Sequence, residues 1–174
     1  MATGKTAGAA HLSETARGYL RLLLRIALLA AAAVLLLTKV FLITRVRGNE
    51  MFPAIRDGDL IAVFRLQRSY AKNDVVVYTY GDSTYVGRIA ALAHDVVTID
   101  ESGVLSVNGT EQHGEILYPT YAKGSLTYPY TVSEGGVFIL GDERTAAHDS
   151  RERGEIAAEN IEGKVIGLLR RRGL

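Results

Sequence analysis

The stretch GGVFILGDERTAAHDSR covers residues 135–151. It begins with an apolar run rich in β-forming residues and ends in a turn that contains both acidic and basic residues. The first half has the β-branched and aromatic composition of a buried strand, and the Gly-Asp that follows signals a turn. A lone Gly-Asp is common in surface turns, but ordinary surface ion pairs explain the whole pattern Gly-Asp-x-Arg-x-x-x-x-Asp-Ser-Arg poorly. The pattern predicts a fixed cluster of charges and hydrogen bonds, formed by Asp142, Arg144, Asp149, Ser150 and Arg151.

Further β-rich runs precede this stretch. Turn signals bound them, and no helical segment separates them at the spacing of βαβ units. We therefore predict a mostly β, antiparallel domain over residues 45–174, with an irregular excursion at about 111–136. The sequon-like Asn108-Gly109-Thr110 is better explained as an Asn-Gly hairpin turn. The runs are DLIAVFRL (59–66), DVVVYTY (74–80), YVGRIAAL (85–92), DVVTID (95–100) and VLSVNG (104–109).

A long apolar segment comes before this domain. From Ile26 to Thr44 only Thr38, Lys39 and the terminal threonine are polar, and the run would make about 28 Å of helix, enough to cross a bilayer core. We predict one transmembrane anchor over residues 20–44, which places the chain in a cell membrane, in contact with the lipid bilayer. The length of the run disfavours a cleaved signal peptide, and the lack of a polar stripe disfavours a buried helix of a soluble domain.

The basic residues flanking the apolar segment lean slightly towards a cytoplasmic N-terminus. Residues 1–19 are then predicted to be a cytoplasmic mobile tail, and residues 45–174 to lie outside the cytoplasm. The flanking basic residues are Lys5, Arg17, Arg21 and Arg25 before the segment, and Arg45 and Arg47 after it.

The bulk composition excludes several kinds of function. The chain of 174 residues carries a formal net charge of +1 and has no cysteine. A charge this small does not recruit nucleic acid, and the lack of cysteine excludes disulfides, zinc–thiolate sites and a thiol nucleophile. We expect no nucleic-acid partner, no metal and no cofactor.

Three boxes in order give the chain a resemblance to bacterial type I signal peptidase, over residues from about 20 to 170. The resemblance implies a β-rich, membrane-docked domain that removes signal peptides outside the cytoplasm with a serine–lysine dyad. In such a dyad the lysine must be neutral to act as a base, and burial in an apolar site lowers its pKa. The boxes are Gly48-Asn49-Glu50-Met51-Phe52-Pro53 with Asp57-Gly58-Asp59, then Asn73-Asp74 with Tyr85-Val86-Gly87-Arg88, then Gly141-Asp142-Glu143-Arg144 with His148-Asp149-Ser150-Arg151.

The chain departs from the family pattern at the residues that carry the chemistry. Glu50 stands where the resemblance implies the serine nucleophile, and Gly87 stands where it implies the lysine. Ala147 replaces a small hydroxyl residue that steadies the lysine. Three such changes at positions that touch one another in the family indicate a degenerate dyad.

Other residues are weak substitutes for that dyad. Glu50 with Asp142 or Asp149 would need two carboxylates sharing a proton, which the spacing does not show. Arg88 stays protonated and cannot act as the base, although it could pair with Glu50. We expect Glu50 to be solvent-accessible or paired with Arg88, and His94 and His148 to be solvated loop histidines.

Three hypotheses for the function follow. The first is a non-cleaving factor that binds secreted or pilin precursors or their assembly machinery, resembling the non-catalytic accessory proteins of Gram-positive pilus loci. Met51, Phe52 and Pro53 are its candidate peptide-binding residues, because an extended peptide could add to a strand beside this apolar lip. The second is an active signal peptidase with non-standard catalytic residues. The third is a purely structural β domain tethered to a membrane.

Overall fold

The computed structural model describes residues 14–113 and 118–170, and the chain divides into two compact units between Lys39 and Val40. Helix α1, Glu14–Val40, carries the apolar segment of the first unit. Residues Thr15–Val40 are long and apolar enough to cross a membrane, which is compatible with a single-pass anchor. Of the predicted mobile tail, residues 1–13 lie outside the described residues, whereas residues 14–19 are helical.

The apolar helix ends earlier than its composition predicts. The second unit begins with strand β1, Phe41–Arg45, which occupies residues that we expected to extend the anchor. The strand pairs antiparallel with β2, Leu60–Phe64, with Phe41 opposite Phe64 and their rings 5.6 Å apart. Aromatic and β-branched residues such as those of Phe-Leu-Ile-Thr pack well across strands, so pairing determines the structure here rather than hydropathy.

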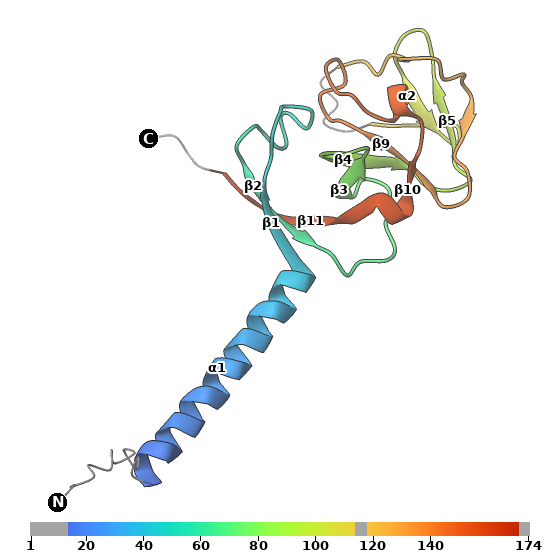
Figure 1. Ribbon diagram of the computed structural model, residues 1–174. Coiled ribbons are helices and arrows are strands. Elements are labelled where there is room, and N and C mark those ends of the chain that lie inside the picture. The colour runs from blue at the N-terminus through green and yellow to red at the C-terminus, as the bar shows by residue number, and fades with distance from the viewer. Residues whose placement is uncertain (1–13, 114–117, 171–174) are drawn as a thin grey trace, which may run out of the picture. The chain divides into compact units, whose positions relative to one another are not determined.

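Two antiparallel sheets form the second unit, which confirms the predicted mostly β fold with one N-terminal apolar helix (Figure 1). The larger sheet has the order β1-β2-β11-β3-β4-β9-β10. Apolar side chains from both faces of this sheet form two of the three core clusters. The remaining strands of this sheet are β3 (Val75–Tyr80), β4 (Ser83–Ala91), β9 (Gly136–Leu140), β10 (Ile156–Ala157) and β11 (Ile161–Leu169).

The smaller sheet has the order β7-β6-β5-β8 and packs its own apolar cluster around Phe138 and Leu140. Asn108 and Gly109 form the two-residue turn between β6 and β7, with φ of 53° and 75°. Positive φ at both central residues is what a type I′ hairpin requires, so the Asn-Gly turn is confirmed. The predicted excursion contains the short strand β8 and residues 114–117, which lie outside the described residues. The strands are β5 (Val96–Ile99), β6 (Leu105–Val107), β7 (Thr110–Glu111) and β8 (Tyr130–Thr131).

Candidate functional site

Glu50 lies in the loop between β1 and β2, and hydrogen bonds between the two ends of this loop fix it. The Gly48 N–H donates to Asp57 Oδ1 at 2.9 Å, and the Asp57 N–H donates to Asn49 Oδ1 at 3.1 Å. The Gly-Asn and Asp-Gly elements of the first box therefore close the loop. They hold residue 50 at a defined place beside the sheet.

Glu50 and Ala147 lie close together around Gly141. The Glu143 N–H donates to the Glu50 carbonyl at 2.9 Å. A Cβ at Gly141 would overlap the Ala147 methyl group and would lie 2.6 Å from the Glu50 carbonyl oxygen, so only glycine fits between them. The His148 N–H lies 3.4 Å from Glu50 Oε1, at the long limit for a hydrogen bond.

Two side chains that the sequence analysis did not identify pack against Gly87 on β4. A Cβ at this glycine would overlap the Ile139 Cγ2 methyl group and would lie 3.2 Å from Tyr78 Cε1. Both residues are buried, and both belong to the core cluster on one face of the large sheet. The position that the Cβ of a lysine at residue 87 would occupy is therefore blocked by Ile139 and crowded by Tyr78.

Tyr78 is a neutral phenol near Glu50. Burial raises the pKa of Tyr78 well above its ordinary value of 10.0, Arg153 partly opposes this rise, and the negative charge of Glu50 adds to it. The ring of Tyr78 stacks on Tyr85 with centroids 5.8 Å apart. A phenol with a raised pKa stays protonated near neutral pH and cannot accept a proton, so Tyr78 does not replace a lysine in proton abstraction.

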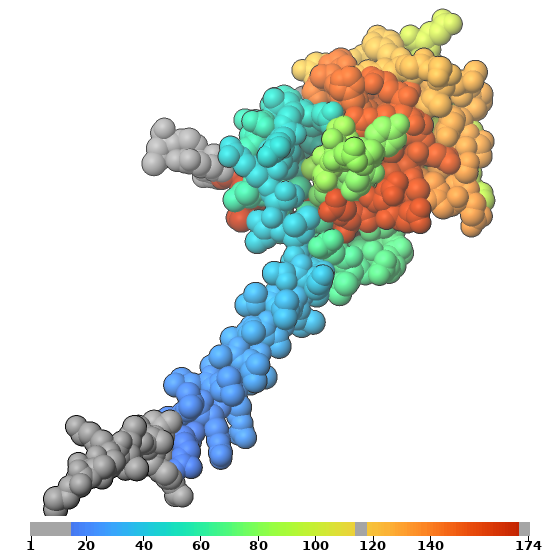
Figure 2. Space-filling model, viewed as in Figure 1, coloured from blue at the N-terminus to red at the C-terminus, as the bar shows by residue number. Residues whose placement is uncertain are grey.

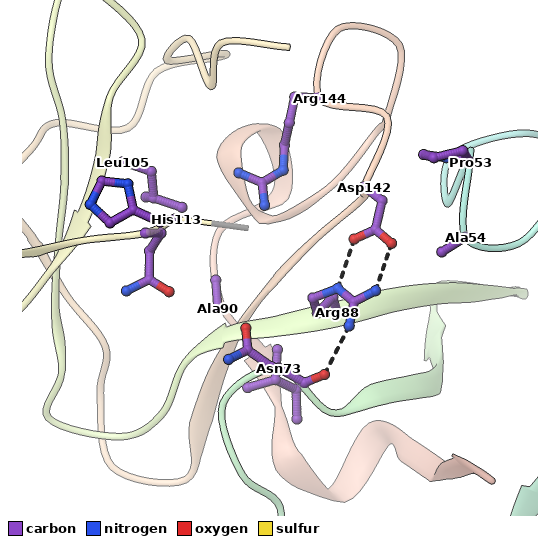
Figure 3. Close-up of a pocket in the computed structure, with 11 residues that line it drawn as sticks. Pro53, Ala54, Asn73, Arg88, Ala90, Leu105, His113, Asp142 and Arg144 are labelled. Atoms are coloured by element: carbon purple, nitrogen blue, oxygen red, sulfur yellow. Dashed lines mark hydrogen bonds and ion pairs between the residues drawn. The ribbon is translucent and has the colours of Figure 1, made fainter. Parts of the chain in front are cut away.

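Glu50 is half-buried, so its side chain keeps part of the solvent exposure that we expected. The alternative that we offered, a pair between Glu50 and Arg88, is wrong. Arg88 instead donates from Nε and Nη2 to the two carboxylate oxygens of Asp142, at 2.8 and 2.7 Å (Figure 3). Its Nη1 donates to the Asn73 carbonyl at 3.0 Å. This bidentate geometry is the preferred one between arginine and a carboxylate, and Glu50 offers nothing comparable.

The residues of the third box are brought together, as the motif predicts, and most of the cluster is buried. Arg151 is 0% exposed and donates from Nε and Nη2 to the two carboxylate oxygens of Asp149, at 2.9 and 2.8 Å. Asp149 also caps helix α2, Ser150–Arg153, and accepts the Gly141 N–H at 3.1 Å. The Ser150 hydroxyl accepts the Ile139 N–H at 2.9 Å. The motif thus fixes the loop that carries Ala147 against strand β9.

Both aspartates of the cluster are held by arginines, which argues against either of them forming a catalytic carboxylate pair with Glu50. Asp142 is held by Arg88 and Asp149 by Arg151, each through both oxygens. Each of these carboxylates has both oxygens hydrogen-bonded to an arginine, so neither leaves an oxygen unengaged for a pair with Glu50. The geometry therefore gives no support to aspartic-type chemistry at this site.

Lysine and histidine near the site are held in other roles. Lys123 Nζ donates to the carbonyls of Thr145 and Ala147, both at 2.9 Å, so it holds the backbone of this loop. His148 is exposed and lies 2.8 Å from Glu152, and His94 is exposed beside Glu134 at 3.1 Å. Within residues 14–113 and 118–170 no group of three or more His, Cys, Asp or Glu side chains could hold a metal ion.

The candidate peptide-binding lip is only partly a surface. Met51 is buried and packs with Val46 and Ile55, whereas Phe52 and Pro53 are half-buried. Met51 still forms part of the floor of a groove of about 810 Å³, between residues 44–51 and the start of β4. In Figure 2 the cyan segment and the light-green β3–β4 turn form the two sides of this hollow.

The groove has an apolar floor and a charged rim. Val46, Val77 and Val86 line it together with Met51, and the charged side chains around it belong to both signs. No single signal in the sequence marks this groove, because its two walls lie far apart along the chain. The charged residues that line it are Arg45, Arg47, Glu50, Asp57 and Asp82.

A family model and a related sequence show the family to which the chain belongs. The family model described as signal peptidase, peptidase S26, matches residues 19–169. Signal peptidase I of Bacillus caldolyticus is 30% identical over 136 residues, covering 69% of this chain and 74% of the relative. Signal peptidase IB of Staphylococcus aureus is 26% identical over 162 residues, covering 80% and 84%. A crystal structure of a signal peptidase I from Enterococcus faecalis has a TM-score of 0.46 and 22% identity, covering 57% of this chain and 98% of that one.

Proposed function

The chain belongs to the signal peptidase family, peptidase S26, and from this membership we propose that it binds a secreted or pilin precursor without cleaving it. The observation that carries the proposal is the filled space over Gly87, beside a carboxylate at position 50. A serine–lysine mechanism needs a hydroxyl nucleophile and a neutral amine within hydrogen-bond reach. Position 50 lacks the hydroxyl, and Ile139 and Tyr78 leave no room at position 87 for the Cβ of a lysine.

Lys123 does not supply the missing base. Its ammonium group donates to two carbonyl oxygens and lies 3.8 Å from Glu152. These contacts direct Nζ towards the backbone of residues 145 and 147 and towards Glu152. A fixed ammonium here fits a role in holding the loop of residues 145–147.

The groove between residues 44–51 and the start of β4 supports peptide binding. Strand β1 is the edge strand of the large sheet, so its outer side offers backbone groups for strand addition. Main-chain bonds of that kind give affinity, and the apolar floor gives pockets for alternate side chains. Retaining the groove while losing the dyad is what a binding factor requires. The pilin alternative among the precursors rests on the resemblance to accessory proteins of pilus assembly.

We further propose that the protein is a single-pass membrane protein with a cytoplasmic N-terminus and the β domain outside the cytoplasm. Helix α1 supports the anchor, and an exposed apolar sheet face in the β domain supports contact with lipid. Phe41 and Ile43 alternate on β1 and share this face with Leu60 of β2 and Leu169 of β11. All four side chains are exposed, and Ile43 is 68% exposed.

The test is cleavage and capture by the full-length protein in detergent micelles, with a panel of secretory and pilin precursors. We expect a precursor to be retained by the native protein with its length unchanged. The matched control is a variant that restores the dyad, Glu50→Ser, Gly87→Lys and Ala147→Ser, combined with Ile139→Ala to give the lysine space. Site-specific cleavage by the native protein would overturn the proposal, and loss of that cleavage in Glu50→Gln would then identify Glu50 as the reacting group.

A further inference from the structure

Three arginines and two aspartates cluster at the loop of residues 141–151, and their pairing leaves one arginine without a carboxylate partner. Arg88 pairs with Asp142 through two hydrogen bonds, and Arg151 pairs with Asp149 in the same way. Arg144 is the third arginine and is 5% exposed. Both nearby carboxylates already have arginine partners, so Arg144 lacks an anion of its own.

The hydrogen bonds of Arg144 confirm this imbalance. Its Nε donates to the Gly141 carbonyl at 2.9 Å and its Nη1 donates to the Thr120 hydroxyl at 2.6 Å, both neutral acceptors. Among the residues that the structure describes, Nη2 makes no hydrogen bond. Burial, and then the positive charge of Arg151, lower the pKa of Arg144 below its ordinary value. A buried cation with unused donors is costly unless an anion reaches it.

Arg144 lines a cavity of about 320 Å³. Figure 3 shows the Arg144 guanidinium on the cavity side, between Leu105 and His113 on one flank and Asp142 on the other. Pro53, which belongs to the same loop as Glu50, lies beyond Asp142. The volume is at the lower end for ligand pockets, and suits one side chain better than a large ligand.

We propose that this cavity binds a carboxylate, and that the carboxylate is an acidic side chain of the peptide held in the neighbouring groove. A guanidinium presents parallel N–H donors that match the two oxygens of a carboxylate. Val86 lines the groove and Arg88 lines the cavity, and these residues lie two apart on β4. Alternate residues of a strand share a face and are about 7 Å apart, so an extended peptide in the groove continues towards Arg144. The peptide part of this inference rests on the proposed function, whereas the carboxylate site does not.

The first measurement is thermal unfolding of full-length protein in detergent micelles, in sodium acetate and in sodium chloride at equal ionic strength. We expect acetate to raise the Tm of the native protein relative to chloride. Gln112→Glu is the informative variant, because it places a nearly isosteric carboxylate on the wall of the same cavity. In this variant the effect of acetate should disappear. Asn160→Asp, an exposed position outside the cavity, makes the same change of charge and should keep the effect.

The second measurement is fluorescence anisotropy with labelled, alanine-rich extended peptides in pairs that carry Asp or Asn at successive positions. We expect the Asp peptide to bind about ten-fold more tightly at one position, the size of one charged hydrogen-bonded contact. That preference should vanish in Gln112→Glu and persist in Asn160→Asp. Arg144→Gln should also remove it, but this change additionally breaks the bonds to Gly141 and Thr120.

The outcomes separate the two proposals. Equal Tm in acetate and chloride, with equal affinity for Asp and Asn peptides, would overturn the carboxylate site while leaving peptide capture intact. Stabilisation by acetate without binding of any peptide would establish the site and overturn its assignment to a peptide. Greater stabilisation by inorganic phosphate than by acetate would overturn the carboxylate in favour of a phosphate.

Discussion

The filled space over Gly87 predicts that even one methyl group at this position destabilises the domain. In Gly87→Ala the added Cβ overlaps Ile139 Cγ2 and lies 3.2 Å from the Tyr78 ring. Both neighbours are buried in the same cluster and have little room to move. Overpacking of this kind costs about 1–3 kcal/mol of unfolding free energy.

A double-mutant cycle isolates this contact. Ile139→Ala alone should cost about 2–5 kcal/mol, as for other large-to-small core substitutions. In the double variant the new methyl group at position 87 enters the space vacated by Ile139. The combined loss should therefore fall short of the sum of the single losses by about 1–3 kcal/mol.

Urea unfolding of the full-length protein in detergent, followed by tyrosine fluorescence and near-ultraviolet circular dichroism, measures these free energies. Gly167→Ala is the matched control. A Cβ at this strand glycine would lie 3.7 Å from the Ala62 Cβ, which is an ordinary van der Waals contact. Its stability should change by no more than about 0.5 kcal/mol. If Gly87→Ala were as stable as Gly167→Ala, or the cycle showed no coupling, the claim that the lysine site is filled would be refuted.

Three further predictions concern the same domain. Arg151→Gln should cost about 3–5 kcal/mol in urea unfolding, because Asp149 is left as a buried charge without its partner; a loss below 1 kcal/mol would contradict the buried pair. Hydrogen bonding from Arg170 holds the pKa of Asp59 below its ordinary value of 3.8, so stability is present at neutral pH and is lost as the pH falls below about 4. Arg170→Gln should flatten this acid limb of the pH–stability curve, and an unchanged curve would exclude the pair as its cause. The pKa of Tyr78 is raised in the folded protein, so on raising the pH this phenol ionises in the unfolded chain before it does in the folded one. The free energy of unfolding should therefore decrease above pH 10, and Tyr78→Phe should reduce that decrease in alkaline unfolding experiments.

Features set by local sequence could be predicted. The Asn108-Gly109 turn follows from two residues that tolerate positive φ, and the antiparallel β class follows from short runs between turn signals. The cluster around Asp149 and Arg151 lies within one stretch of chain, so its spacing alone indicated that these side chains meet. The end of the anchor helix could not be predicted, because the residues of β1 are as apolar as the helix before it, and only pairing with β2 makes them a strand.

The packing of Tyr78 and Ile139 against Gly87 could not be predicted, for a different reason. Tyr78 and Ile139 come from two other strands of the large sheet, and nothing in either run marks them as neighbours of the dyad positions. The pairing of Arg88 with Asp142 instead of Glu50 has the same origin, since β4 and β9 bring the first two together. Contacts across a sheet depend on strand order and register, which composition does not specify.

Different physical requirements maintain the buried Asp149–Arg151 pair and the residues at the two dyad positions, Glu50 and Gly87. Arg151 and Asp149 form a buried pair whose loss leaves an uncompensated charge, so the stability of the fold is enough to maintain them whatever the protein does. Their presence is therefore evidence for the fold and carries no information about cleavage. Gly87 answers to a packing demand of its own, because Tyr78 and Ile139 fill the space over it and leave no room for a side chain. The filled space over Gly87 and the carboxylate of Glu50 are therefore the features from which activity or its absence has to be argued.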